Sequence, residues 1–131
     1  MHATLTVYDE TATGKRLGSF ELQLVSERIS VRDLIRRRIE HEVDVYNREE
    51  PGYFKGLVQP TDAEATLNGY KLSKRRRLDA EQQYAQALRA FESNGFFMLV
   101  DDRQVEGLDE EITIGEHTEV SFVKLVPLVG G

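Results

Sequence analysis

The residues with the clearest chemical potential in this chain are Gly130 and Gly131, which follow the apolar run VKLVPLV. Glycine has no Cβ, so a carboxylate at Gly131 is unhindered and its backbone can adopt conformations that other residues avoid. If extended, residues 127–131 span roughly 16 Å at about 3.3 Å per residue, enough to carry that carboxylate into a buried site. We therefore expect that the chain is a folded domain that delivers the carboxyl group of Gly131 to the active site of a partner protein. The alternative is a frayed end without function.

The rest of the chain lacks the groups with which it could activate a carboxylate itself. It has no cysteine to carry a thioester, and neither phosphate-binding pattern, GxxxxGK[ST] or GxGxxG, occurs. The histidines His2, His41 and His117 do not have the spacing of metal ligands, so we expect no metal site and no catalytic residue. The sequence predicts that the chain is not an enzyme.

Composition favours one globular domain over residues 1–131, since 40% of residues are apolar and 31% are charged. No apolar run approaches the roughly 18 residues of a membrane span, and the first residues do not resemble a signal peptide. With the lack of cysteine, this predicts a cytoplasmic protein that has no membrane partner. The net charge of −6 argues against nucleic acid as a partner.

Charged residues form clusters for which a solvated surface is the ordinary explanation. Arg36, Arg37 and Arg38 lie in a predicted helix and are expected to face solvent, as is the basic run 74–77, which could also meet an acidic partner. The acidic cluster lacks the EF-hand pattern. We interpret its members as turn and connector residues: Asp101, Asp102, Glu106, Asp109, Glu110 and Glu111.

Hydrophobic periodicity predicts the elements of the first third of the chain. Residues 4–8 and 19–25 alternate between apolar and polar, with Gly14 in the polar segment between them, which is typical of an antiparallel hairpin. Ser30 is a suitable N-cap, and the apolar residues after it recur at helical spacing. This predicts a helix over 31–46.

The segment 47–95 is predicted to fold, because it is too long for a structureless loop. Asn68 and Gly69 are the strongest two-residue signal for a hairpin turn. Residues 78–91 predict a second helix, for which Asp79 is the N-cap.

The last part of the chain is predicted to be rich in strands. Apolar runs predict strands at 96–100, 105–108 and 118–126, with a turn at 101–104 and an irregular connector at 109–117. Pro127 cannot donate to a sheet, so the last strand should end before it.

Alternation in that last strand also predicts a binding surface. Val120 and Phe122 are expected to face the core, which directs Val123 and Leu125 outward beside the tail. Exposed apolar residues next to a reactive terminus predict a docking patch for a partner. Its candidate residues are Val123, Leu125, Pro127, Leu128 and Val129. The alternative is that the segment 47–95 covers this surface as ordinary core.

The order of hairpin, helix, further strands and a terminal Gly-Gly resembles the ubiquitin-like β-grasp superfamily. The resemblance is most specific in FFMLVDDRQVEGLDEEITIGEHTEVSFVKLVPLVGG, which is similar to ubiquitin-like proteins, to the molybdopterin-synthase small subunit and to thiamine-type sulfur carriers. It covers residues 3–46 and 96–131. It implies an α+β fold in which one helix packs on a mixed sheet. The insertion 47–95 and a flexible tail at 127–131 would be added to that fold.

The resemblance also implies a reaction and its partners. In that superfamily an activating enzyme uses ATP to adenylate the terminal carboxylate, here that of Gly131, so this chain would bind no cofactor. Gly130 and Gly131 would be the conjugation site. The acyl group would then pass through a conjugating enzyme to an amine of a target protein, or accept sulfur as a thiocarboxylate for a sulfur acceptor. Transfer to an amine would be analogous to the reaction of ubiquitin-like modifiers in bacterial conjugation systems. A non-covalent binding module with an idle tail is the third possibility.

If such a modifier formed chains, one of its own lysines would be the acceptor. The candidates are Lys15, Lys55, Lys71, Lys74 and Lys124. The sequence does not select among them.

Overall fold

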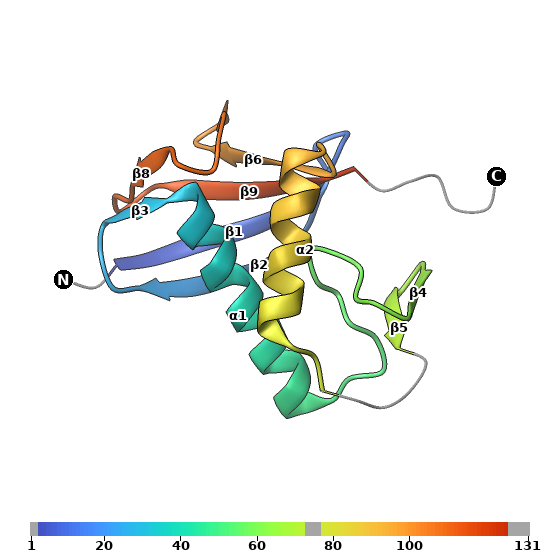
Figure 1. The fold of residues 1–131 in the computed structure, drawn as a ribbon. Coiled ribbons are helices and arrows are strands. Elements are labelled where there is room, and N and C mark those ends of the chain that lie inside the picture. The colour runs from blue at the N-terminus through green and yellow to red at the C-terminus, as the bar shows by residue number, and fades with distance from the viewer. Residues whose placement is uncertain (1–2, 73–76, 126–131) are drawn as a thin grey trace.

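The computed structural model describes residues 3–72 and 77–125, and its largest unit is a mixed five-stranded sheet with two helices on one face (Figure 1). The strand order is β2-β1-β9-β6-β7, in which β1 and β9 are parallel and the other neighbours are antiparallel. The predicted α+β class is confirmed. Among the described residues, no helix lies on the opposite face of the sheet (Figure 1).

The predicted amino-terminal hairpin is present, with longer strands than expected. β1 (Ala3–Thr11) pairs with β2 (Arg16–Leu24), and Gly14 takes a positive φ of 90° in the turn between them. Pairing continues past the apolar residues because the backbone hydrogen bonds of an antiparallel ladder do not depend on side-chain type.

The first helix, α1 (Val31–Glu49), begins where Ser30 accepts a hydrogen bond from the backbone N–H of Asp33 at 3.1 Å. It continues three residues past the predicted end at residue 46. Glu50 closes it in the left-handed region, with φ of 48°, and donates its N–H to the carbonyl of Tyr46. Pro51 follows directly and cannot extend the helical ladder.

The prediction of an irregular connector at 109–117 was wrong in part. β8 (Glu111–Thr113) pairs antiparallel with β3 (Arg28–Ser30), which leads into α1. Ile112 and Ile114 are buried and anchor this connector to the core. A strand of three residues is too short to show alternation, so the sequence pattern could not reveal it.

The segment 47–95 folds as its local signals predict. β4 (Ala63–Thr66) and β5 (Gly69–Leu72) form a hairpin, and α2 (Ala80–Glu92) begins at the N-cap Asp79, which accepts from the N–H of Glu81 at 3.0 Å. The hairpin turn lies one residue earlier than predicted, because Thr66 pairs with Gly69. The backbone at position 69 still requires glycine, because its φ of 124° is one that residues with a side chain rarely adopt.

This segment is joined to the core and does not form a separate layer. The side chain of Asn47 donates to the carbonyl of Leu78 at 3.0 Å and accepts from the N–H of Leu78 at 2.7 Å. The segment also contributes buried side chains to the core: Phe54, Leu57, Val58, Leu78, Tyr84 and Ala87. A single hydrophobic cluster therefore lies between the sheet and the two helices.

The sheet is completed by β6 (Phe96–Val100), β7 (Arg103–Gln104) and β9 (Glu119–Lys124). The return strand was predicted at 105–108 and is instead β7. Asp101 and Asp102 both have positive φ, 49° and 69°, so they form a two-residue turn and the chain reverses earlier than expected. β9, the central strand, ends at Lys124.

Candidate functional site

The predicted conjugation site falls outside the described residues, but the strand that leads to it does not. Gly130 and Gly131 lie beyond residue 125, as do three predicted docking residues, Pro127, Leu128 and Val129. β9 is paired on both sides, with β1 in parallel and with β6 in antiparallel register. The chain is thus held at the centre of the sheet up to its last described residues.

The carboxyl end of β9 is fixed by contacts from three directions. Lys124 pairs in register with Thr11 of β1 and Phe96 of β6, and the N–H of Leu125 donates to the carbonyl of Gly95 at 3.3 Å. On the helix side, Nζ of Lys124 donates to the carbonyl of Gly56 at 2.8 Å. Whatever follows residue 125 starts from a defined position.

The two docking residues that can be placed, Val123 and Leu125, lie on the sheet face that has no helix. Val120 and Phe122 are fully buried on the other face, as expected, and Leu125 is 37% exposed. Val123 is half-buried and opposes Phe97 of β6 across the ladder; Leu99 follows on the same face. The hydrophobic core does not include Phe97, Leu99 or Val123, and none of the three packs against it. We call Phe97, Leu99, Val123 and Leu125 the apolar sheet patch.

One prediction about the basic cluster on α1 was wrong. Arg36 and Arg37 are partly exposed, but Arg38 is 1% exposed and is among the largest fully buried side chains. Its Nη1 and Nη2 donate to the two carboxylate oxygens of Asp9, the second at 2.9 Å, and its Nε donates to Glu42 at 3.1 Å. Arg38 shares the inward face of α1 with Ile35, Ile39 and Val43, where helical spacing places residue 38.

Burial governs the electrostatics of this cluster. Burial lowers the pKa of Arg38, but the charge of Glu42 and the hydrogen bond and charge of Asp9 outweigh it and raise that pKa above its ordinary value. Burial raises the pKa of Glu42 and exceeds the opposing effects of Arg38 and of the N–H of Leu57. Burial also lowers the pKa of Lys124. The guanidinium of Arg38 lies 4.6 Å from the ring centroid of Phe122, so it also contacts the central strand.

This buried cluster ties the segment 47–95 to the end of β9. Glu42 accepts from the N–H of Leu57 at 3.1 Å, and Lys124 binds the neighbouring carbonyl of Gly56. The ammonium of Lys124 is thus engaged inside the molecule, whereas Lys15, Lys55 and Lys71 are exposed. Lys74, the remaining lysine, lies outside the described residues.

The other candidate groups have structural environments. His41 stacks on Phe20 with ring centroids 5.0 Å apart, and burial lowers its pKa, which favours the neutral imidazole. His117 is exposed, and His2 is not among the described residues. Over residues 3–72 and 77–125, no group of three or more histidines, aspartates or glutamates could hold a metal ion.

The acidic residues between 101 and 111 were predicted to be turn and connector residues; Asp101 and Asp102 do form a turn, but Glu111 lies in β8, and several of these residues also form hydrogen bonds or ion pairs. Asp101 accepts from the N–H of Glu119 at 2.9 Å, and Glu110 accepts from Arg103 and from the N–H of Glu106. Asp109 pairs with Arg32, and Glu111 pairs with Arg28 at 2.7 Å.

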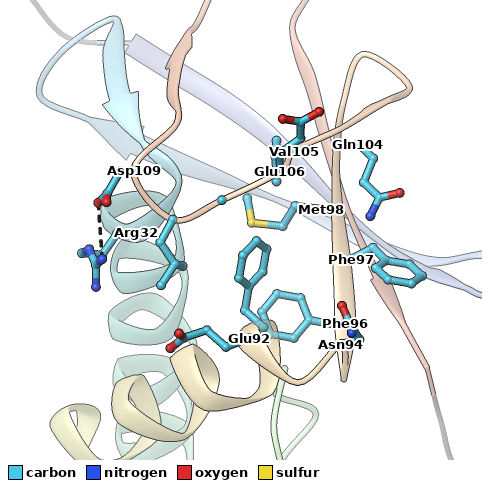
Figure 2. Close-up of a pocket in the computed structure, with 13 residues that line it drawn as sticks. Arg32, Glu92, Asn94, Phe96, Phe97, Met98, Gln104, Val105, Glu106 and Asp109 are labelled. Atoms are coloured by element: carbon cyan, nitrogen blue, oxygen red, sulfur yellow. Dashed lines mark hydrogen bonds and ion pairs between the residues drawn. The ribbon is translucent and has the colours of Figure 1, made fainter.

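Two surface cavities were not foreseen from the sequence. One of about 380 Å³ lies between α1, Phe20 of β2 and residues 51–55, with Asp9, Arg38 and Glu42 among its lining. The other, of about 450 Å³, lies between the end of α2, β6 and residues 104–109 (Figure 2). The Asp101-Asp102 pair forms the turn between β6 and β7 but does not line the second cavity.

None of the helices described is long and apolar enough to cross a membrane. No protein-family model, no curated protein and no solved structure matches this chain.

Proposed function

We propose that this chain is a ubiquitin-like protein modifier of the β-grasp type. Its Gly131 carboxylate would be adenylated by a partner enzyme that uses ATP and then joined to an amine of a target protein. The observation that carries the proposal is that the central strand β9 contributes Val123 to the apolar sheet patch and is followed in the sequence, after a short spacer, by Gly130 and Gly131. The reaction requires a free carboxylate at Gly131.

The arrangement of the elements supports the β-grasp part of the proposal. A hairpin, a helix across it and a parallel pairing of the first and last strands at the centre of the sheet are the layout expected of that fold. The segment between α1 and β6 adds the β4–β5 hairpin and α2 to this arrangement. We infer that this addition gives the modifier a surface of its own for partners.

The apolar sheet patch is the proposed docking surface for the activating enzyme. Phe97, Leu99, Val123 and Leu125 form it from the strands β6 and β9 and from the residue after β9, so they lie next to the start of the tail. A partner bound there would hold β9 while residues 126–131 extend into its active site. Apolar residues that stay partly accessible are the usual material of such surfaces; here Leu125 is exposed and the other three are half-buried.

A covalent adduct is the direct test. The chain, carrying an affinity tag at its amino terminus, is expressed in its source cells, purified under denaturing conditions and digested with trypsin. Trypsin cleaves after Lys124, so a conjugated lysine would keep residues 125–131 as a branch that mass spectrometry identifies. The matched control lacks Gly130 and Gly131 and should give no branched peptide.

The same experiment separates the alternatives. Exchange of one oxygen for sulfur at the Gly131 carboxylate, with no branched peptides, would instead identify a sulfur carrier. An unmodified terminus in every sample, with function retained after removal of Gly130 and Gly131, would identify a non-covalent binding module. Either result would contradict the modifier proposal.

A further inference from the structure

The cavity between α1, Phe20 of β2 and residues 51–55 has mainly apolar and aromatic walls; we call it the α1 cavity. Its volume of about 380 Å³ lies within the range of small-molecule pockets, roughly 300–1,000 Å³. It is lined by three charged pairs of neighbours in space only at its floor and rim, and most of its lining is apolar or aromatic: Phe20, Val45, Tyr46, Pro51, Tyr53 and Phe54.

The aromatic walls are accessible and are held in place from behind. Phe20, Tyr46 and Tyr53 are half-buried, so each keeps part of its surface open to a ligand. Phe20 stacks on His41 with ring centroids 5.0 Å apart, and Tyr46 packs edge-on against the buried Phe54 at 5.3 Å. Rings fixed in this way form a surface against which a flat aromatic group can stack.

The charges at the floor of the α1 cavity are already matched to one another. The buried guanidinium of Arg38 donates to both carboxylate oxygens of Asp9 and to Glu42. The side chains of Asp9 and Glu42 are only 17% and 11% exposed. A cationic ligand would have to compete with Arg38 for these carboxylates. Burial also lowers the pKa of His41, so its imidazole adds no charge at pH 7.

The charge that remains accessible at the cavity is positive. Lys55 is the exposed member of its charged lining, and within residues 3–72 and 77–125 it forms no ion pair. On the nearby face of α1, Arg37 is paired with Glu40 and Arg48 with Asp44, so these charges cancel. The flexible stem of a lysine allows its ammonium to meet an anionic group at the mouth of the cavity.

We propose that the α1 cavity binds a small aromatic carboxylic acid. The aromatic ring lies against Phe20, Tyr46 and Tyr53, and the carboxylate pairs with the ammonium of Lys55. Burial of the ring supplies most of the affinity, and Lys55 supplies the preference for an acid. The site shares no residue with the tail or with the apolar sheet patch, so the proposal does not depend on the conjugation reaction.

The experiment uses two probes with the same ring and opposite charges. 2-Naphthylacetate and 2-(2-naphthyl)ethylamine are titrated separately into the full ¹⁵N-labelled chain and followed by NMR. We expect the acid to shift the amides of Phe20, Tyr53 and Lys55 with a dissociation constant below about 1 mM, and the amine to bind at least about threefold more weakly. The net charge of −6 favours the amine at non-specific sites, so a preference for the acid is a stringent result.

Variants separate the ring contact from the charge contact. Lys55→Gln should weaken binding of the acid about threefold to fivefold and should not weaken binding of the amine. Its matched control is Lys71→Gln, at an exposed position on β5, which should change neither affinity. Tyr53→Ala should weaken both probes about tenfold, whereas Leu125→Ala in the apolar sheet patch should weaken neither.

Four results would overturn the proposal. The first is that the acid causes no shifts at the α1 cavity at millimolar concentration, and the second is that the amine binds as tightly as the acid. The third is an equal loss of acid binding in Lys55→Gln and Lys71→Gln. The fourth is that the largest shifts lie at the apolar sheet patch and are lost in Leu125→Ala, which would show adsorption to exposed apolar surface.

Discussion

Arg38 shows how a single residue can be misjudged from a charge run. It follows Arg36 and Arg37 in sequence, yet its side chain is buried among α1, Asp9 of β1 and Phe122 of β9. The α-helical spacing of 3.6 residues per turn places residue 38 with Ile35 and Ile39 and not with its neighbours. A buried guanidinium is tolerated because two carboxylates, Asp9 and Glu42, satisfy it.

Replacing that guanidinium is therefore expected to be severe. Arg38→Met keeps much of the volume but leaves the carboxylates of Asp9 and Glu42 without their counterion. We expect a loss of about 3–5 kcal/mol in the free energy of unfolding. The comparison is Arg37→Met, at a partly exposed position, which should stay within about 0.5 kcal/mol. Urea unfolding monitored by circular dichroism measures both, and similar losses in the two variants would contradict this view of the cluster.

Glu42 should give the protein a specific pH dependence. Burial raises its pKa in the folded state above the ordinary value of 4.5, so in this window the folded protein binds more protons than the unfolded chain. The contribution of Glu42 to stability is then fully present below about pH 4.5 and declines as the pH rises through the folded pKa.

The variant Glu42→Gln isolates this contribution, because its amide oxygen can still accept from the N–H of Leu57 and cannot titrate. Relative to the variant, the unmodified chain should lose stability as the pH rises from 4.5. Unfolding free energies measured from pH 4 to pH 8 for both proteins test the slope. A stability difference that is flat, or that grows with pH in favour of the unmodified chain, would show that burial does not control this carboxylate.

At the scale of elements, the β4–β5 hairpin depends on one glycine. Gly69 has a φ of 124°, and a Cβ there would approach the carbonyl oxygen of Phe54 at 3.0 Å. That approach is enforced by paired hydrogen bonds at 2.8 Å between the backbones of Phe54 and Tyr70. The hairpin is thus attached to the 51–58 segment, which the buried ion cluster in turn holds against α1 and β9.

Gly69→Ala should destabilise the chain by about 1–3 kcal/mol, since alanine does not tolerate this backbone conformation. Gly18→Ala is the matched control, because Gly18 lies in β2 with open space around its Cβ position. It should change stability little or raise it slightly, by lowering the entropy of the unfolded chain. Thermal unfolding of the two variants side by side decides the point; equal melting temperatures would rule out the proposed role of Gly69.

At the scale of the whole molecule, the arrangement presents three surfaces. The helices cover one face of the sheet (Figure 1), and the apolar sheet patch lies on the other face. The cavity lined by Glu92 and Glu106 lies beside β6 (Figure 2). The apolar sheet patch and the cavity adjoin, because Phe97 belongs to both.

Leu125→Asp should slow conjugation about tenfold if the sheet patch docks the activating enzyme, because it places a charge in an apolar contact. Leu67→Asp is the control: Leu67 is 97% exposed at the tip of the β4–β5 hairpin, far from the patch in sequence. The rate of appearance of branched tryptic peptides in cells that express each variant is the measurement. Unchanged rates for Leu125→Asp, or equal reductions for both variants, would remove the patch from the proposal.

The sequence by itself determined the elements whose signals are local. The Ser30 and Asp79 caps, the helical spacing within 31–46 and 78–91, the hairpin around Asn68-Gly69 and the burial of Val120 and Phe122 each follow from residues close together in the chain. The Gly-Gly pair, with the chemistry expected of it, is also a sequence feature alone, because it lies outside the described residues.

Only the tertiary structure decided the features that join distant residues. The ion cluster unites Asp9, Arg38 and Lys124, and β3 pairs with β8 across most of the chain. The cavity beside β6 depends on where the chain departs after Val105. Such contacts depend on the packing of side chains in space and on which strands become neighbours, and neither leaves a period in the sequence. Hydrophobic periodicity indicates which face of its own helix or strand a residue occupies. It does not indicate which residues of other elements that residue contacts.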